Sequence, residues 1–270
     1  MATPALLFAP TAAPAASAAD AAVTKPAVTR GNAWYLRNSA TTGIGDIAFV
    51  YGDPGDITLM GDWNGDGTDT PGVVRNGMWY LRNSNTTGIG EVSFAYGDPR
   101  DVPIVGDWDG NGTDTPGVFR QSTSEWHLRN SNTKGIGEIS FMFGPPPPSS
   151  GAVIDTLDTA LAGDWDGNGT DTPGGVGGPI VLAEPDGSAT TSWRLHNSNN
   201  STDYASSPSF AFRARGRTFL AGDWNGDGRF SPGAFDPERG TWGLRNANTS
   251  GGTDSEFLYG NPGDRPLTWE

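Results

Sequence analysis

Short runs of alternating apolar and polar residues recur along this chain, separated by Gly, Pro, Asn and Asp. One unit covers residues 57–97 and contains four such runs: Ile57–Met60, Gly72–Arg75, Met78–Asn83 and Glu91–Tyr96. A period of two is typical of β-strands with one buried face, and runs this short exclude long helices. The pattern therefore predicts four short strands in each unit.

The connections predict that these strands are antiparallel. Asn76-Gly77 separates the second run from the third, and this dipeptide is a strong hairpin signal. Gly97-Asp98-Pro99 closes the unit with further turn residues. Four antiparallel strands in about 45 residues are typical of one propeller blade.

The unit repeats five times. The string Trp-x-Leu-Arg-Asn-Ser occurs at three positions and returns with one or two changes at two more: Trp34, Trp79, Trp126, Trp193 and Trp242. A second string, Gly-Asp-Trp-[Asn/Asp]-Gly-[Asp/Asn]-Gly, alternates with the first and places Asp at 62, 107, 164 and 223. We therefore expect an all-β fold, a five-bladed β-propeller of four-stranded antiparallel blades.

The two ends of the repeat region complement each other. Pro26–Trp34 matches Pro71–Trp79, so the repeat opens on the second strand of a blade. Arg265–Thr268 resembles a first strand, Val102–Val105. Pairing of these N- and C-terminal strands would close the ring and remove exposed sheet edges. The last two residues, Trp269 and Glu270, do not continue into a fifth Gly-Asp-Trp loop and receive no role from the sequence.

Two insertions interrupt the rhythm. Pro145–Pro148 and the residues after it lengthen the approach to the third Asp loop, and Gly174–Ser192 enlarges the following hairpin. Such insertions belong on a blade rim, where loops are tolerated and often functional. Drift in an unselected loop explains them equally well.

Composition supports a turn-rich β protein and leaves its compartment undecided. The chain has 40 Gly, 21 Pro, 10 Trp and no Cys, with a formal net charge of −14. That charge repels a phosphate backbone, so nucleic acid is excluded as a partner. No apolar run approaches the roughly 20 residues that cross a bilayer, so no membrane span is expected.

The domain plan is a leader followed by one domain. Residues 1–22 are rich in Ala and Pro and include Ala16-Ser17-Ala18, which fits a small-residue cleavage site. The positive n-region is missing, so the segment is interpreted as a secretion signal remnant, with a flexible leader as the alternative. Residues 23–270 are expected to form a single propeller in a secreted or cell-surface protein.

The Asp loops carry the candidate metal chemistry. Asp62, Asn64 and Asp66 occupy loop positions 1, 3 and 5, and Gly67 at position 6 permits a sharp turn that lets the Thr68 carbonyl point inward. Oxygen ligands at these spacings suit a hard cation of the size of Ca²⁺. Metal-free Asx turns are the alternative, because Asp, Asn and Gly clusters also make ordinary turns. An EF-hand is excluded, since position 12 carries no bidentate acid and strand-like sequence follows.

With these loops, the units resemble the FG-GAP/VCBS repeats of bacterial surface proteins and of the integrin α-subunit propeller, over roughly residues 24–268. In that family the metal loop joins the first two strands of a blade. The resemblance implies ligands at positions 1, 3 and 5 of each loop: Asp62, Asn64, Asp66; Asp107, Asp109, Asn111; Asp164, Asp166, Asn168; Asp223, Asn225, Asp227.

The loops depart from the family at position 9, which usually carries Asp. A hydroxyl stands there in all four loops: Thr70, Thr115, Thr172 and Ser231. Position 8 carries Asp69, Asp114 and Asp171, with Phe230 in the fourth loop, which should be the weakest site. Either the position-8 carboxylate reaches the ion, or a hydroxyl or water replaces the ninth ligand. Position 7, a carbonyl ligand, is Thr68, Thr113, Thr170 or Arg229.

We expect up to four structural Ca²⁺ ions that cancel repulsion among the clustered carboxylates. The first three loops contain three Asp each and the fourth two, which accounts for much of the acidic excess.

No catalytic motif is found. The chain lacks a Ser-His-Asp arrangement, a H-E-x-x-H motif and a phosphate loop. A hydrolase is the least favoured function, and we expect no enzyme. The loop tryptophans (Trp63, Trp108, Trp165, Trp224) are assigned to packing between blades, and the recurring arginines (Arg37, Arg82, Arg129, Arg245) to pairing with acids.

Two binding functions remain. The family resemblance implies a protein-binding or adhesion module, and the alternative is a calcium-stabilised lectin with sugar pockets between blades. A lectin should keep similar pocket residues in most blades, yet the corresponding residues are Tyr80, His127, Arg194 and Gly243. That variation favours one asymmetric protein site on a monomer.

Overall fold

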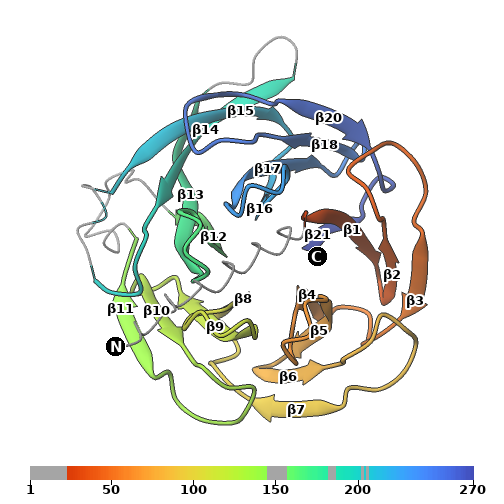
Figure 1. Ribbon diagram of the computed structural model, residues 1–270, viewed down its shortest axis with the longest axis vertical. Helices are drawn as coiled ribbons and strands as arrows, with labels where there is room; N and C mark the ends of the chain where they lie inside the picture. The colour runs from red at the N-terminus through yellow and green to blue at the C-terminus, as the bar shows by residue number, and fades with distance from the viewer. Residues whose placement is uncertain (1–22, 145–156, 182–186, 202–203, 205–206) are drawn as a thin grey trace, which may run out of the picture.

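Five small antiparallel sheets stand around a central axis, as the repeat predicts (Figure 1). The computed structural model describes residues 23–144, 157–181, 187–201, 204 and 207–270. The predicted leader 1–22 and the insertion beginning at Pro145–Pro148 lie outside the described residues. The five-bladed, all-β fold is confirmed.

Each blade runs from an innermost first strand to an outermost fourth strand (Figure 1). Blade 1 consists of β21 (Arg265–Trp269), β1 (Lys25–Arg30), β2 (Ala33–Leu36) and β3 (Ile47–Val50); blade 2 of β4 (Ile57–Gly61), β5 (Thr70–Arg75), β6 (Met78–Leu81) and β7 (Val92–Ala95); and blade 3 of β8 (Val102–Gly106), β9 (Thr115–Arg120), β10 (Glu125–Leu128) and β11 (Ile139–Met142).

Blades 4 and 5 follow the same plan with one addition. Blade 4 consists of β12 (Leu157–Gly163), β13 (Thr172–Val181), β14 (Ser188–Leu195) and β15 (Ser209–Arg215); blade 5 of β16 (Thr218–Gly222), β17 (Ser231–Asp236), β18 (Thr241–Leu244) and β20 (Ser255–Leu258). The short strand β19 (Gly251–Gly252) pairs in parallel with β15 and so links blade 5 to blade 4.

The ring closes within blade 1. Strand β21 pairs antiparallel with β1 from Lys25↔Trp269 to Thr29↔Arg265, as the matching termini predict. Trp269 is buried, and its indole N–H donates to the Arg37 carbonyl at 3.1 Å. The Lys25 ammonium lies 4.7 Å from the Trp269 ring centroid, a cation–π distance. The last tryptophan of the chain is therefore part of the closure.

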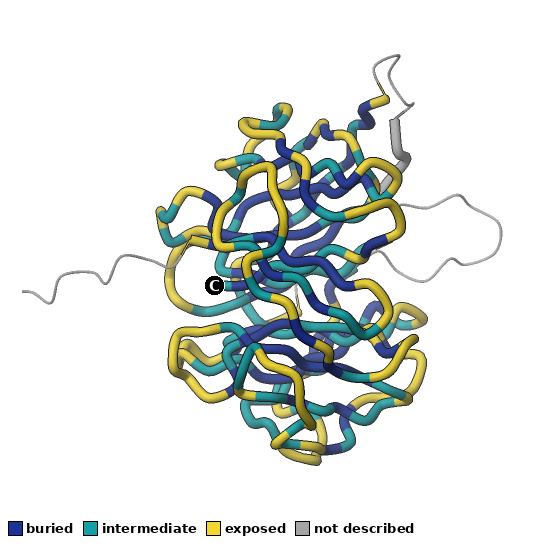
Figure 2. The backbone as a smooth tube through the Cα atoms, turned by 90° about the vertical axis from the view of Figure 1, so that its right-hand side faces the viewer, coloured by how far each residue is buried: buried dark blue, intermediate teal, exposed yellow. Residues whose placement is uncertain are grey.

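The core lies between the blades and along them (Figure 2). The third-strand tryptophans (Trp34, Trp79, Trp126, Trp193, Trp242) are fully buried. Trp63 packs in a cluster that also contains Val118 of the next blade, and the other loop tryptophans lie in corresponding clusters. The prediction that they pack between blades is confirmed.

The third strands are shorter than their sequence pattern predicts. Strand β6 ends at Leu81, whereas alternation continues to Asn83. The guanidinium of Arg82 turns into the following loop, where it donates to the carbonyls of Thr86 and Ile89 at 2.8 Å each. These loop contacts replace the strand pairing that alternation alone would suggest.

The enlarged fourth hairpin is formed by long strands. Strand β13 has 10 residues and β14 has 8, against 4 to 6 for their counterparts in blade 2. Their pairing shifts register between Gly177 and Val181, which marks an irregularity in the ladder. Among the described residues, no helix is long and apolar enough to cross a membrane.

Ring closure makes Trp269 a sensitive position. Trp269→Ala should lower the free energy of unfolding by about 3 kcal/mol, the usual cost of deleting a buried aromatic ring. Urea denaturation followed by tryptophan fluorescence measures this change. Ile44→Ala is the control, because Ile44 is 84% exposed and its loss should be nearly neutral. Equal stability of the two variants would show that β21 does not hold the ring.

Candidate binding face and metal loops

One face of the propeller carries two sets of loops. The inner loops (62–69, 107–114, 164–171 and 223–230) join the first and second strands of blades 2 to 5. The outer loops (37–46, 82–91, 129–138, 196–208 and 245–254) join the third and fourth strands. Asn85 of an outer loop donates to the Asp69 carbonyl of an inner loop at 3.0 Å, so the two sets lie on the same face.

Each inner loop is folded around the carboxylate at its first position. Asp62 Oδ1 accepts from the amides of Gly65 and Asp66 at 2.8 and 3.1 Å, and Oδ2 accepts from Gly67 at 2.7 Å. The carboxylates of Asp164 and Asp223 accept from the corresponding three amides in their loops. A carboxylate that accepts several backbone N–H groups is strongly held.

The same contacts bear on whether calcium fits. In loop 62–69, Asp66 Oδ1 already accepts from Thr68 N at 3.0 Å, and Asp66 Oδ2 from Asn64 Nδ2 at 2.9 Å. Across the described residues, no three or more His, Cys, Asp or Glu side chains converge as a metal-binding group. The donor set thus fits a hard cation only in part, through carboxylate, amide and carbonyl oxygens with free lone pairs.

The position-8 aspartates point away from their own loops. Asp114 Oδ2 accepts from the Asp62 amide of the preceding blade at 2.9 Å, while Asp114 N donates to the Asp62 carbonyl at 2.8 Å. Asp171 makes the same pair of contacts with Asp107. We call this two-bond contact the latch. In the fourth loop Phe230 keeps only the backbone half, donating to the Asp164 carbonyl at 2.8 Å.

The position-9 hydroxyls contact the carbonyl of the residue just before their own loop and so join the two ends of that loop. Thr70 Oγ1 lies 3.4 Å from the Gly61 carbonyl, and Thr115, Thr172 and Ser231 make the equivalent contacts. These four side chains are buried. Position 7 serves the contact between loops, since Thr113 lies against Gly65, Thr170 against Gly110 and Arg229 against Gly167 of the preceding blade.

Glu270 and Thr24 complete the ring of latches at blade 1. Glu270 occupies the first-position place in blade 1: its amide donates to Asp69 Oδ2 at 3.1 Å, and its carbonyl accepts from Asp69 N at 3.3 Å. Thr24 occupies the eighth-position place, with Thr24 N donating to the Asp223 carbonyl and Asp223 N donating to Thr24 Oγ1, each at 2.8 Å. Sequence reasoning missed both roles, although aligning Arg265–Trp269 with Ile57–Gly61 puts Glu270 in register with Asp62.

A second bridge between blades comes from the outer-loop asparagines. Asn132 Nδ2 donates to the carbonyls of Trp63 and Asp114 at 3.2 and 3.0 Å, so one amide joins blades 2 and 3. Asn199 and Asn248 make the same double contact farther round the ring. The sequence signal for this bridge is an Asn six residues after the third-strand Trp, which occurs in blades 2 to 5.

The latches line the mouth of a central channel of about 500 Å³. All five inner strands also contribute apolar residues to the channel lining, among them Leu59, Ile104, Leu161, Leu220 and Leu267. At the mouth, burial together with the neighbouring charges of Asp62 and Asp107 raises the pKa of Asp114 to about 7, although the hydrogen bond from the Asp62 amide opposes this rise. Burial and neighbouring carboxylates likewise hold the pKa values of Asp69 and Asp171 well above the ordinary range.

The outer loops are built around arginines of intermediate burial, whose side chains are 12 to 14% exposed. Arg37 donates to the carbonyls of Thr41, Thr42 and Ile44 at 2.7, 3.1 and 2.8 Å, and a side chain at Gly43 would collide with the guanidinium. Arg82, Arg129 and Arg245 repeat this arrangement. The predicted pairing with acids is present too, for example Arg129 with Glu138 at 2.9 Å. A rigid outer loop follows from this network.

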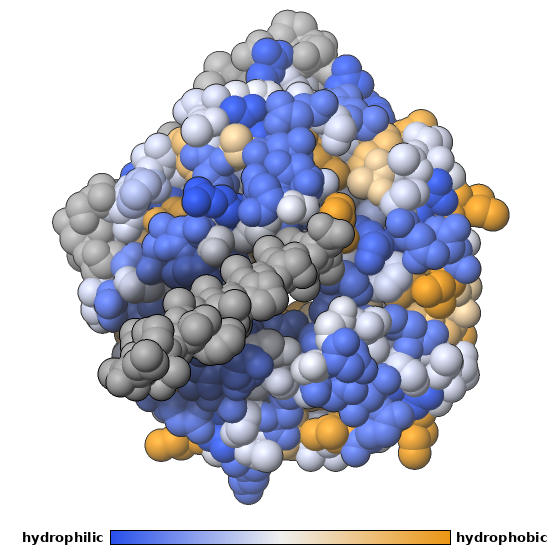
Figure 3. Space-filling model, in the orientation of Figure 1, coloured by the Kyte–Doolittle hydropathy of each residue, from blue (hydrophilic) through white to orange (hydrophobic). Residues whose placement is uncertain are grey.

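Three of these loops carry an exposed isoleucine. Ile44, Ile89 and Ile136 are each 84% exposed, far more than any other large apolar residue of the described chain. The loops also reach the outermost strand of the preceding blade: Leu258 N donates to Thr42 Oγ1 and Val50 N to Thr87 Oγ1, at 3.0 Å each. We call the three isoleucines the rim isoleucines. In Figure 3, apolar side chains project from the periphery of an otherwise largely hydrophilic face.

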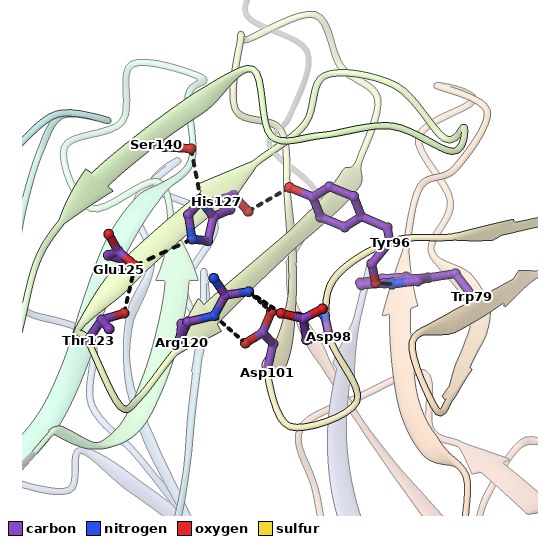
Figure 4. Close-up of polar contacts among 9 residues, drawn as sticks. All are labelled: Trp79, Tyr96, Asp98, Asp101, Arg120, Thr123, Glu125, His127 and Ser140. Carbon is purple, nitrogen blue, oxygen red and sulfur yellow. Dashed lines mark hydrogen bonds and ion pairs between the residues drawn. The ribbon is translucent and has the colours of Figure 1, made fainter.

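A polar cluster lies between blades 2 and 3 (Figure 4). His127 Nδ1 lies 2.9 Å from Ser140 Oγ, and His127 Nε2 lies 3.9 Å from Glu125 Oε2. Thr123 donates to the same Glu125 oxygen at 2.7 Å, and Tyr96 donates its hydroxyl to the His127 carbonyl at 2.9 Å. The Glu125–His127 separation is too long for a hydrogen bond, so this cluster is not an assembled catalytic triad.

The corresponding positions differ from blade to blade. Tyr35 and Tyr80 lie beneath Arg30 and Arg75, with the guanidinium carbon 5.5 and 5.6 Å from the ring centroids. In blade 4 the guanidinium of Arg194 lies 4.9 Å from the Tyr204 ring, and blade 5 has Gly243. The positions that correspond to His127 are therefore not built the same way in most blades.

Comparison with known proteins adds no identity. No protein-family model, no curated protein and no solved structure matches this chain. The fold and the two sets of loops define the class of protein, a five-bladed β-propeller with an acidic, loop-bearing face.

The raised pKa of Asp114 predicts a pH dependence. Because the folded-state pKa is above the unfolded value, the folded chain binds more protons, and stability should fall as pH rises from about 4 to about 7 in metal-free buffer. Asp114→Asn retains an acceptor for the Asp62 amide without the charge. This variant should be more stable than the wild type near pH 8 and less sensitive to pH. Thermal unfolding at several pH values tests this expectation, and a less stable variant near pH 8 would contradict it.

Proposed function

We propose that this propeller is a protein-binding module that docks its partner at the loop-bearing face and its rim. The observation that carries the proposal is the presence of three rim isoleucines, each 84% exposed, on loops that their arginines hold rigid. An isoleucine that stays 84% exposed buries little area on folding, whereas a pre-organised apolar side chain contributes to binding at low entropic cost.

The charge of the molecule indicates the chemistry of the partner. The formal net charge is −14, and the inner loops place Asp66, Asp109, Asp166 and Asp227 on the same face as the rim isoleucines. Like charge opposes a second copy of this chain and an anionic membrane. A basic protein surface with apolar depressions complements both features, and electrostatic attraction would speed its association.

Enzymatic and sugar-binding functions have weaker support. The polar cluster of His127, Ser140 and Glu125 occurs in one blade, and its histidine and glutamate are 3.9 Å apart. A lectin with repeated sites would need similar pocket residues in several blades, and the positions equivalent to His127 vary. We therefore propose no reaction for this protein, and glycan binding is the second candidate.

Calcium has a structural place in this proposal. The residues that would hold it are those at positions 1, 3 and 5 of each inner loop, with the position-7 carbonyl. When bound, the ion would neutralise clustered carboxylates and stiffen the loop. An extracellular or cell-surface location, where calcium is at millimolar levels, is part of the same proposal.

The rim isoleucines should determine partner binding. We expect peptides selected from a random display library on immobilised propeller to be rich in Lys, Arg and apolar residues. The triple variant Ile44→Ser, Ile89→Ser and Ile136→Ser should weaken their binding by at least about tenfold for each isoleucine that is buried. Fluorescence anisotropy with the selected peptides measures the loss.

The control is a variant that removes exposed apolar side chains from the opposite face of the propeller. Ile57 and Val102 are 39% exposed and begin the inner strands at the other end of the channel. The double variant Ile57→Ser and Val102→Ser should bind as the wild type does. Peptides that bind both variants equally would contradict the proposed surface. Binding to a glycan array, with no peptide selected, would favour the second candidate.

Calcium binding predicts a chelator effect. Removing Ca²⁺ with EGTA should lower the melting temperature of a calcium-loaded sample, because the clustered carboxylates then repel one another. Magnesium in place of calcium should restore little of the loss, since it demands a tighter octahedral site. An unchanged melting temperature would leave the inner loops as metal-free Asx turns held by their own amides.

A further inference from the structure

The chain contains five Asn-Gly dipeptides in comparable exposed loops and turns. Four stand in the inner loops, at Asn64-Gly65, Asn111-Gly112, Asn168-Gly169 and Asn225-Gly226, and the fifth is the hairpin turn Asn76-Gly77. Asn-Gly is the dipeptide most prone to spontaneous deamidation, because glycine offers no side chain to obstruct the attacking amide. The structure treats these five chemically identical dipeptides differently.

In the four inner loops the attacking nitrogen is held. The amides of Gly65, Gly112, Gly169 and Gly226 donate to the first Asp of their loops at 2.8, 2.7, 2.7 and 2.8 Å. Hydrogen bonds to an ionised carboxylate are stronger than neutral ones. Each of these glycine nitrogens must leave a carboxylate before it can react.

The asparagine side chains of the inner loops are held as well. Asn111 Oδ1 accepts from Thr113 N, and Asn168 Oδ1 accepts from Thr170 N, both at 2.8 Å. Asn64 and Asn225 donate through Nδ2 to the carboxylates two residues later, at 2.9 and 3.0 Å. The carbon that would be attacked is therefore fixed in its loop.

The hairpin Asn76-Gly77 lacks these restraints. Asn76 is exposed, with φ +52°, and Gly77 has φ +77°, which gives the turn between β5 and β6 two left-handed residues. Within the part of the chain that the structure describes, neither the Gly77 amide nor the Asn76 side chain makes a hydrogen bond. Neither reacting group therefore has to leave a hydrogen-bond partner before the two react.

We infer that Asn76 is the site of spontaneous deamidation in this protein, and that the first Asp of each inner loop protects the Asn of that loop. The Gly77 nitrogen loses its proton and bonds to Cγ of Asn76. The Cγ–Nδ2 bond breaks, and Nδ2 takes up the proton and leaves as ammonia. Water then opens the succinimide to aspartate or isoaspartate at position 76. Isoaspartate adds a methylene to the backbone of a two-residue turn, directly beside Arg75, which holds Asp56 at 2.7 Å.

Peptide mapping by mass spectrometry tests the inference. Folded protein is incubated in mildly alkaline buffer, and the gain of one mass unit is followed at all five asparagines. Asn76 should deamidate at least about tenfold faster than each of the other four, since each of those must break a charge-assisted hydrogen bond. In urea, where these bonds are lost, the five rates should converge.

Two variants distinguish the effect of the hydrogen bond to the loop's first Asp from the effect of the local sequence on the deamidation rate. Asp107→Ala should accelerate deamidation of Asn111 and leave Asn64, Asn168 and Asn225 slow, with circular dichroism used to show that the variant is folded. Asn76→Gln should remove the fast site without changing the other four. Equal rates at all five sites in the folded protein, or an inner-loop asparagine reacting fastest, would overturn the inference. If Asp107→Ala does not fold, the comparison between folded and urea-treated wild type decides alone.

Discussion

The latch between consecutive inner loops is the interaction on which the rest of this structure depends. A propeller blade cannot bury both of its faces alone, so the ring is stable only if every junction is made. Each latch fixes the start of one blade's second strand against the loop of the blade before it, as Asp114 does at Asp62. The buried tryptophans then pack in the space that the latches define.

The latch also explains why the acids are concentrated at the channel mouth. A carboxylate that accepts a backbone N–H must lie where the chain enters the second strand, and five such entry points surround one axis. Burial at these entry points, with the repulsion between neighbouring carboxylates, raises the pKa values of Asp69, Asp114 and Asp171. Thr24 and Phe230 take the other two places, so the ring carries three carboxylates instead of five at this level. The uncharged places limit the repulsion that the latches create.

The fold could be predicted from the sequence because each blade of the repeat is marked by signals between residues that are close together in the chain. Trp79 and Leu81 report a buried strand face, Asn76-Gly77 reports a hairpin, and the match of Pro26–Trp34 to Pro71–Trp79 reports closure. The sequence was insufficient for the direction of Asp69 and Asp114. Spacing within a loop describes that loop alone, whereas these side chains accept from amides 201 and 52 residues away in the chain. The bracing role of Arg82 was hidden similarly, since alternation assigns it to a strand that ends one residue earlier.

Ring closure by two terminal strands has a mechanical consequence. Lys25 and Trp269, where β1 begins and β21 ends, face each other in the same antiparallel pair. A force that pulls these two points apart loads the ladder at one end, so its hydrogen bonds break one after another and not together. Blade 1 would open strand by strand from this end, while the other four blades, whose four main strands follow one another in the chain, would bear no load until it had opened. Tethered at these points, the protein would yield at small forces and could reform from four intact blades when the force is released.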